Sequence, residues 1–269
     1  MRFKQFLEAK VKSYDHEPAA THDLVELLDR HCLQALRSAQ AGNFIYRGSR
    51  STLPAGVYNP GSGERKSQNT SNFYTIFLDT NPLNDEFPKR SKSFITTNNR
   101  YKAENYASGP ILYCFPFDDV KIGLVDSDDF WDLRIDFDVL FSAGDSIADL
   151  NDFWEELIGD MLLKSSDIKS LADMISAIKS EHPATVANRL HRNGYLYGVN
   201  RSKISDEEIV KRFVASLPKA YSYKQLDCKL TTPDDIPDPD KGSCEMWFSG
   251  KCVMIPENIL DEIREELGL

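Results

Sequence analysis

Metal-ligating and disulfide-forming residues are scarce in this sequence. Its 269 residues include five cysteines and five histidines, and no two cysteines are separated by only two residues. An odd cysteine count without such pairs favours free thiols over a disulfide framework. Because the histidines show no ligand spacing relative to the cysteines, we predict no metal site. The cysteines are Cys32, Cys114, Cys228, Cys244 and Cys252.

Long apolar runs are also lacking. No stretch approaches the roughly 18 uncharged apolar residues that a membrane helix needs, so no membrane partner is expected. Residues 1–8 (MRFKQFLE) carry charges on both sides of a very short apolar patch and lack the apolar core of a signal peptide. An apolar content of 41% still provides material for a sizeable core. We therefore expect a cytoplasmic globular protein.

Basic residues are too few to balance the acidic ones, and the net charge is −10. The imbalance is uneven, because residues 1–102 hold 15 Lys/Arg and 10 Asp/Glu, whereas residues 103–269 hold 17 and 32. The overall sign argues against non-specific coating of nucleic acid. The basic first part leaves room for a local anionic ligand, and an unevenly charged solvated surface is the alternative.

The order of apolar patterns predicts a mixed α+β fold. Thr21 is the predicted N-cap of the first helix, and Gly42 is its predicted C-cap residue. The pair Asn98-Asn99 predicts the cap of a short helix that begins at Arg100. We predict one domain over residues 1–269 with a mainly helical insertion at 130–235. The predicted helices are 21–41, 100–107, several within 146–217, and 256–267. The predicted strands are 44–46, 93–97, 111–115, 121–125 and 246–255, the last a strand or a hairpin, and 73–78 is either a strand or a helix start.

Two short segments combine apolar, strand-forming residues with groups that bind anions. Arg47 follows the strand-like 44–46 and precedes Gly48, so it offers a fork of donors where a ligand can approach the backbone closely. In 91–97 (SKSFITT), basic and hydroxyl side chains alternate before an apolar pair. Taken alone, the first also fits a surface arginine, and the second fits an edge strand whose charge blocks aggregation.

A third segment places a carboxylate at the start of an aromatic strand. Glu245 precedes Met246, Trp247 and Phe248, and glutamate is depleted in strands. A solvent-facing residue at a strand end is the alternative interpretation. Together the three segments provide a fixed cation, several hydroxyls and one carboxylate, a set suited to holding a phosphate-containing dinucleotide and stabilising a sugar cation.

The order of these segments resembles the mono-ADP-ribosyltransferase family of the Arg–Ser–Glu type. Residues 46–48 (YRG) resemble its first motif, and 94–98 (FITTN) resemble its Phe-x-Ser-Thr-Ser motif. Ala103 and Tyr106-Ala107 suit the helix that follows, and Glu245 resembles the catalytic glutamate. Segments 65–74 and 88–93 look similar to phage-encoded relatives, for which a toxin-like role in the host cytoplasm would be expected.

The resemblance implies an ADP-ribosyltransferase-like split β-sandwich with an N-terminal helix, and NAD as the substrate. Glu245 would be catalytic, and Thr96 would hydrogen-bond it. Arg47 would contact the diphosphate or ribose, and the Gly48 backbone would hold the nicotinamide amide. The remaining residues that the resemblance assigns to NAD binding are Arg65, Ser93, Thr97 and Tyr106.

The resemblance implies transfer of ADP-ribose to a macromolecule with release of nicotinamide. Ser243 stands where arginine-modifying members carry glutamate, so protein, nucleic acid and water all remain open as acceptors. A non-enzymatic binding or virion-associated protein, using the aromatic-rich helices as an interface, is the alternative function.

Overall fold

The computed structural model describes residues 15–60, 72–135, 145–196 and 199–269, and divides the chain into two compact units. Unit 1 comprises Met1–Gln68, Phe87–Asp129 and Cys228–Leu269. Unit 2 comprises Asn69–Glu86 and Phe130–Asp227. The chain predicted as one domain thus forms two units. Unit 2 covers most of the predicted insertion at 130–235 and adds residues 69–86.

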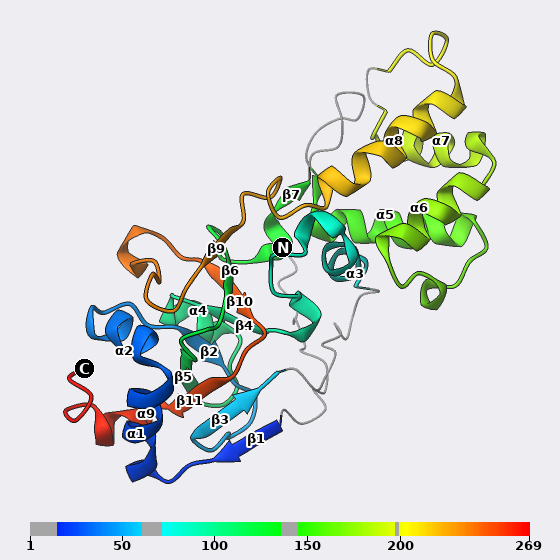
Figure 1. Cartoon of the computed structure of the whole chain (residues 1–269). Helices are drawn as coiled ribbons and strands as arrows, with labels where there is room; N and C mark the ends of the chain where they lie inside the picture. Colours follow the sequence, from blue (N-terminus) through cyan, green and yellow to red (C-terminus); the bar gives the residue numbers. More distant parts are fainter. Residues whose placement is uncertain (1–14, 61–71, 136–144, 197–198) are drawn as a thin grey trace. The chain divides into compact units, whose positions relative to one another are not determined.

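Unit 1 contains an antiparallel sheet of nine strands (Figure 1). The spatial order is β1-β3-β11-β5-β2-β4-β10-β6-β9, so neighbours in the sheet are mostly distant in sequence. The strands are β1 (Asp15–Pro18), β2 (Tyr46–Gly48), β3 (Gly56–Asn59), β4 (Phe94–Thr97), β5 (Ile111–Pro116), β6 (Ile122–Val125), β9 (Lys229–Thr231), β10 (Glu245–Phe248) and β11 (Cys252–Pro256).

The short link between β10 and β11 requires this sheet to curl. Residues 249–251 join them, yet β5, β2 and β4 lie between them in the sheet. In a flat sheet the two strands would be about 19 Å apart at ~4.8 Å per strand, whereas the link spans at most about 14 Å. A single buried cluster accordingly joins both halves of the sheet through Leu112, Cys114 and Met254 on one side and Phe94, Phe248 and Leu124 on the other.

Residues 246–255 were predicted as one strand or a hairpin, and the structure corrects this. β10 pairs with β4 and β6, while β11 pairs with β3 and β5. Each strand therefore finds its partners elsewhere in the chain. Ser249-Gly250 marks a turn between them. Local sequence does not decide which strands they pair with, because the partners are supplied by segments more than 100 residues away.

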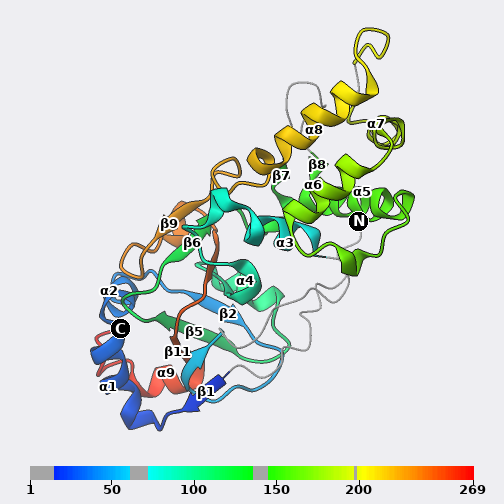
Figure 2. The same cartoon turned by 45° about the vertical axis from the view of Figure 1, so that its right-hand side comes forward.

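Three helices pack against the face of the sheet opposite to that cluster (Figure 2). They are α1 (Thr21–His31), α2 (Leu33–Gln40) and α9 (Glu257–Ile263). The helix predicted at 21–41 is broken at Cys32 (φ −130°, ψ 30°), where no proline or glycine marks the break. Ala20 rather than Thr21 is the N-cap residue, and Gly42 follows α2 at φ +92° as predicted.

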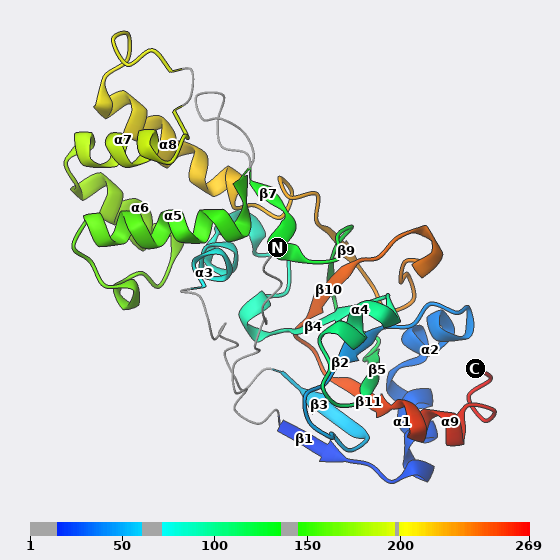
Figure 3. The same ribbon diagram turned by 180° about the vertical axis from the view of Figure 1, so that it is seen from behind.

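Unit 2 is built mainly from helices (Figure 3). Their buried side chains form an aromatic core. Trp154 is buried between Phe77, Phe213 and Tyr221, and its indole Nε1 donates to the Tyr221 hydroxyl at 2.6 Å. The ambiguous segment 73–78 lies within the helix α3. The helices are α3 (Phe73–Thr80), α5 (Ile147–Asp160), α6 (Leu171–Ser180), α7 (Pro183–Arg192) and α8 (Asp206–Ala220), with the strand pair β7 (Arg134–Ile135) and β8 (Asp145–Ser146) beside them in sequence.

The described residues confirm the mixed α+β class, with nine α-helices and the nine-stranded antiparallel sheet of unit 1. The ninth helix, α4 (Arg100–Asn105), packs on β2, β4 and β5. None of the helices in the described ranges combines the length and apolarity of a membrane span.

Candidate functional site

The three segments singled out in the sequence become neighbours in the middle of the sheet. They form β2, β4 and β10, which are adjacent strands in that order. Tyr46 is opposite Thr97, and Thr97 is opposite Glu245. Residues directly opposite one another share a face of a sheet, so these three side chains form one cross-strand row. The sheet thus brings together parts of the chain that sequence reasoning could group only by order.

Glu245 is engaged in a buried ion pair with Arg90. Nη2 of Arg90 lies 2.5 Å from Oε1 of Glu245, and the two side chains are 2% and 10% exposed. The guanidinium also lies over the indole ring of Trp247, 5.0 Å from the ring centroid. A cation at this position is attracted by the aromatic face as well as by the carboxylate. The carboxylate therefore has an immediate cationic neighbour, which the sequence had not assigned to it.

Trp247 fixes the turn that carries Arg90 against β10. Its indole Nε1 donates to the carbonyl of Pro88 at 2.9 Å, and its ring stacks with Phe87 at 6.4 Å. Gly123 is its register partner on β6, and a Cβ atom there would lie 2.2 Å from the indole. Glycine at 123 therefore provides the space that the indole occupies.

The hydroxyl groups of β4 are arranged differently from the prediction. Thr96 was expected to hydrogen-bond Glu245, but its register partner is Met246 and its hydroxyl donates to the Met246 carbonyl at 3.2 Å. Thr97 is the residue opposite Glu245, and its Oγ1 accepts from the backbone of Asn99 at 3.1 Å. Because side chains alternate along a strand, Thr96 lies on the face opposite to Glu245.

Arg47 and Gly48 both take part in packing contacts between elements of unit 1. The side chain of Arg47 is buried, donates from Nη1 to the carbonyl of Ile95 at 2.6 Å, and lies 5.8 Å from the Phe94 ring centroid. It follows Tyr46 on β2, so it lies on the core face with Thr96. A Cβ atom on Gly48 would lie 2.2 Å from the carbonyl oxygen of Ala103. Gly48 therefore allows the close approach of α4, and Arg47 ties β2 to β4.

Two further predicted NAD-binding residues, Ser93 and Tyr106, lie apart from this row. Ser93 is buried and its hydroxyl donates to the carbonyl of Lys89 at 2.7 Å, which closes the turn before β4. Tyr106 follows α4, is 43% exposed, and donates to Oδ2 of Asp129 at 3.3 Å. Arg65 lies outside the described residues. Of the two that the structure describes, Ser93 is therefore buried and Tyr106 is exposed.

Asn98 is a structural residue of the site that sequence reasoning missed. It is fully buried, and its Nδ2 donates to the carbonyls of Pro237 and Gly242 at 3.2 and 3.0 Å. Its Oδ1 accepts from the backbone of Cys244 at 2.8 Å. These bonds hold the loop that leads into Glu245. The signal in the sequence, the pair Asn98-Asn99, predicted a helix cap, and Asn99 alone provides it by accepting from Lys102 N.

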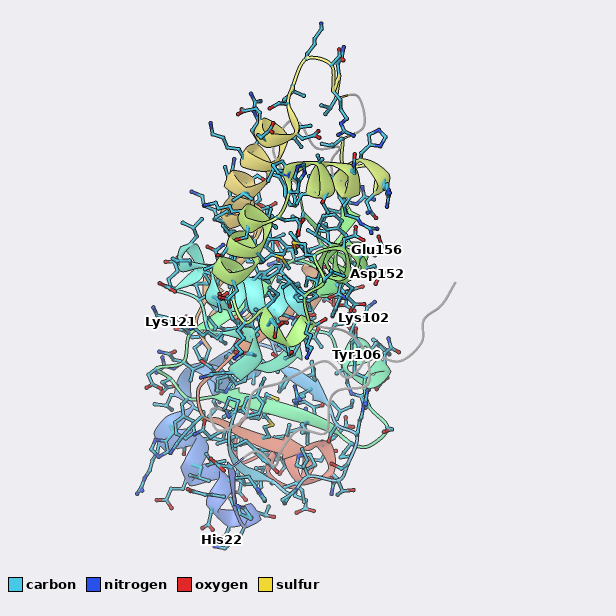
Figure 4. All side chains as sticks on the ribbon, turned by 90° about the vertical axis from the view of Figure 1, so that its right-hand side faces the viewer. His22, Lys102, Tyr106, Lys121, Asp152 and Glu156 are labelled. Atoms are coloured by element: carbon cyan, nitrogen blue, oxygen red, sulfur yellow. The ribbon has the colours of Figure 1, made fainter. Side chains whose placement is uncertain are left out.

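Ion pairs connect the loop after β6 with α4 and with β9. Lys102, labelled with Tyr106 in Figure 4, lies 2.5 Å from Asp128, and this bond lowers the pKa of Asp128. Asp126 pairs with Lys229 at 2.9 Å, which lowers its pKa as well. The intervening Ser127 accepts the backbone N–H of Glu245 at 2.8 Å. Asp126 and Asp128 are thus each paired with a lysine, and the loop anchors the start of β10.

The five cysteines are free and buried. Burial raises the pKa of Cys32 to about 12, and burial together with Asp126 raises that of Cys244 to about 11. Within the described ranges, no group of three or more His, Cys, Asp or Glu is placed to hold a metal ion. Comparison of the chain with family models, curated proteins and solved structures found no match.

Proposed function

We propose that this protein is an NAD-dependent mono-ADP-ribosyltransferase with Glu245 as its catalytic residue. The observation that carries the proposal is the adjacency of β2, β4 and β10, which brings the three segments of the resemblance into one row of side chains. The curled sheet enclosing a core supports the split β-sandwich that the resemblance implies. The positions of these side chains come from the structure, whereas the roles proposed for them in the reaction come from the resemblance.

The proposed reaction breaks the bond between the nicotinamide nitrogen and the ribose carbon of NAD. The electron pair of that bond leaves with nicotinamide, and the acceptor nucleophile bonds to the sugar carbon and loses its proton. A carboxylate stabilises the positive charge that develops on the sugar, as carboxylates do in glycoside hydrolysis. Glu245 would do this while hydrogen-bonding a ribose hydroxyl. Thr97, its register neighbour, replaces Thr96 as the hydroxyl beside the carboxylate.

The contacts to the remainder of NAD stay predictions. Tyr106 offers an exposed ring for a base or ribose. For Arg47 to reach the diphosphate, it would have to leave the carbonyl of Ile95, so its contact with β4 favours a structural contribution. Arg90 is the cation in contact with the proposed catalytic carboxylate.

The test is release of nicotinamide from NAD by the full-length protein, followed by chromatography. Glu245→Gln keeps an oxygen for Arg90 but removes the negative charge, and we expect the rate to fall by about 10²–10³. Glu245→Asp keeps the charge and retracts it by one methylene, which provides a second variant if the amide destabilises the fold. Glu26→Gln is the matched control, because Glu26 pairs with Arg30 at 2.6 Å on the exposed surface of α1.

Two outcomes would reject the proposal. An unchanged rate in folded Glu245→Gln would remove Glu245 from the reaction. Absence of any nicotinamide release by the wild-type protein, with or without cell extract as acceptor, would favour the alternative of a non-enzymatic binding protein. Labelled NAD incubated with extract, then treated separately with protease and nuclease, would distinguish protein, nucleic acid and water as acceptors.

A further inference from the structure

The position of Arg90 is determined by contacts that do not involve Glu245. It begins the short 3-10 turn Arg90–Lys92, which Ser93 closes by donating its backbone N–H to Arg90 O at 3.2 Å. The Ser93 hydroxyl binds the carbonyl of Lys89, one residue before the turn. Trp247 holds the preceding residue, Pro88, through its indole N–H and covers the guanidinium with its ring. Both the backbone and the charged group of Arg90 are therefore anchored.

Glu245 is fixed from its own side. It is the first residue of β10, and it is paired with Thr97 of β4 and Val125 of β6. Its backbone N–H donates to Ser127 O, and the preceding residue, Cys244, donates to Asn98. The carboxylate and the guanidinium thus meet as two separately anchored groups, which is the arrangement that preorganised sites require.

Stability alone is a weak explanation for such a pair. Removing two charges from water is costly, and buried ion pairs are often no more stabilising than apolar side chains of similar volume. Here one member of the pair, Glu245, also lies in the row of β4 and β10 that carries the proposed chemistry. A role in orienting one of its members is a better explanation for a charged pair at this position.

We propose that Arg90 is a positioning residue that orients the Glu245 carboxylate for transfer. This inference rests on the proposed function and adds a residue that positions the same carboxylate. Arg90 binds Oε1, so rotation of the carboxylate about its last bond is restricted. The indole of Trp247 restricts the guanidinium in turn, because the face of an aromatic ring attracts a cation that lies over it.

A lysine at position 90 would keep the positive charge but could not reproduce the geometry of the guanidinium. Its ammonium is a compact point charge without the planar fork, and it would lose the face-on contact with Trp247. Arg90→Lys therefore separates orientation from charge. Arg90→Met removes both and leaves Glu245 as a buried carboxylate without this partner.

The experiment measures kcat and KM for nicotinamide release over a range of NAD concentrations, using the full-length wild type, Arg90→Lys and Arg90→Met. We expect Arg90→Lys to lower kcat about 10- to 100-fold, since misplacement of a reacting group by about 1 Å can cost 10² in rate. KM for NAD should stay within about threefold. Arg30→Lys is the control, because Arg30 belongs to the exposed pair on α1.

The possible outcomes separate this inference from the proposed function. A wild-type protein without nicotinamide release overturns both. An active wild type with unchanged kcat in Arg90→Lys overturns the positioning role alone, and so does a raised KM at unchanged kcat, which would make Arg90 a substrate-binding residue. Circular dichroism confirms that each variant is folded, and Arg90→Met combined with Glu245→Gln should shift the urea midpoint less than the sum of the single shifts.

Discussion

The backbone N–H of Cys244 donates to Oδ1 of Asn98 at 2.8 Å, across 146 positions of sequence. Asn98 follows β4, and Cys244 precedes β10, so this bond joins the ends of two paired strands. The amide nitrogen of the same side chain holds two further carbonyls in the loop before Cys244. One asparagine therefore determines how the chain enters the strand that begins with Glu245.

Asn98→Ala should destabilise unit 1 by about 2–4 kcal/mol. The substitution removes three hydrogen bonds and leaves the buried N–H of Cys244 without this acceptor, and each unsatisfied buried group costs about 1–3 kcal/mol. Hydrogen exchange should become faster in β10 and in the loop before it. Asn99→Ala is the control, because it removes a helix cap worth about 1 kcal/mol and should increase exchange mainly in α4. Equal exchange profiles for the two variants would contradict this role of Asn98.

Gly48→Ala should lower the stability of the protein by about 1–3 kcal/mol. The new Cβ would lie 2.2 Å from the backbone carbonyl of Ala103, so α4 would have to move away from β2. Gly159→Ala should have the opposite effect on stability. Gly159 lies in α5, where an added Cβ would meet nothing within 4 Å, and alanine there should raise helix stability by about 0.5–1 kcal/mol. Unfolding curves in urea measure both, and a tolerated Gly48→Ala would mean that α4 is not packed as described.

Cys244 should resist alkylation in the folded protein at pH 8. A thiol with a pKa of about 11 is roughly 10⁻³ ionised at that pH, whereas a thiol of ordinary pKa near 8.5 is about a quarter ionised. Because the thiolate is the reactive form, we expect labelling by iodoacetamide at least ~100-fold slower than that of free cysteine. Raising the pH should accelerate it. Mass spectrometry locates the label, and rapid modification of Cys244 without denaturant would be inconsistent with its burial.

The Lys102–Asp128 pair should contribute stability at neutral pH and lose it in acid. The pKa of Asp128 is lowered in the folded protein, chiefly by its bond to Lys102, so the unfolded chain binds a proton first as the pH falls. The contribution is present above the ordinary pKa of aspartate, about 4, and disappears as the pH falls through the folded value. Both side chains are more than a third exposed, which limits the effect to about 1 kcal/mol.

Lys102→Met tests this dependence. The free energy of unfolding in urea should differ measurably between Lys102→Met and the wild type at pH 7. At pH 2 this difference should be close to zero. The exposed Lys121 provides the control variant Lys121→Met, for which we expect a smaller difference with less dependence on pH. A difference for Lys102→Met that is equal at both pH values would exclude the ion pair as its cause.

Local sequence predicted secondary structure well where side-chain periodicity and glycine act within a few residues. The end of α2 before Gly42 and the cap of α4 at Asn99 followed from such signals. Local sequence did not predict the break between α1 and α2. There the thiol of Cys32 donates to the carbonyl of Phe115 on β5, a contact 83 residues away that no local pattern encodes.

The candidate site was likewise predicted in part from local sequence and decided in part by tertiary contacts. Sequence order grouped Arg47, residues 94–98 and Glu245, and the sheet does place their strands side by side. Which side chains share a face was decided by strand register. A shift of one residue exchanges the two faces of a strand, and the register places Thr97 rather than Thr96 opposite Glu245.

The amino-acid sequence by itself determined the α+β class, most helices and strands, and the three segments that carry polar chemistry. These properties depend on propensities and periodicities that act over a few residues. The tertiary structure alone decided that β10 and β11 separate, that Arg47 is used inside the sheet, and that Arg90 pairs with Glu245. The physical reason is that strand pairing and buried charge pairing depend on partners far along the chain, and those partners are specified only when the sheet curls around its core.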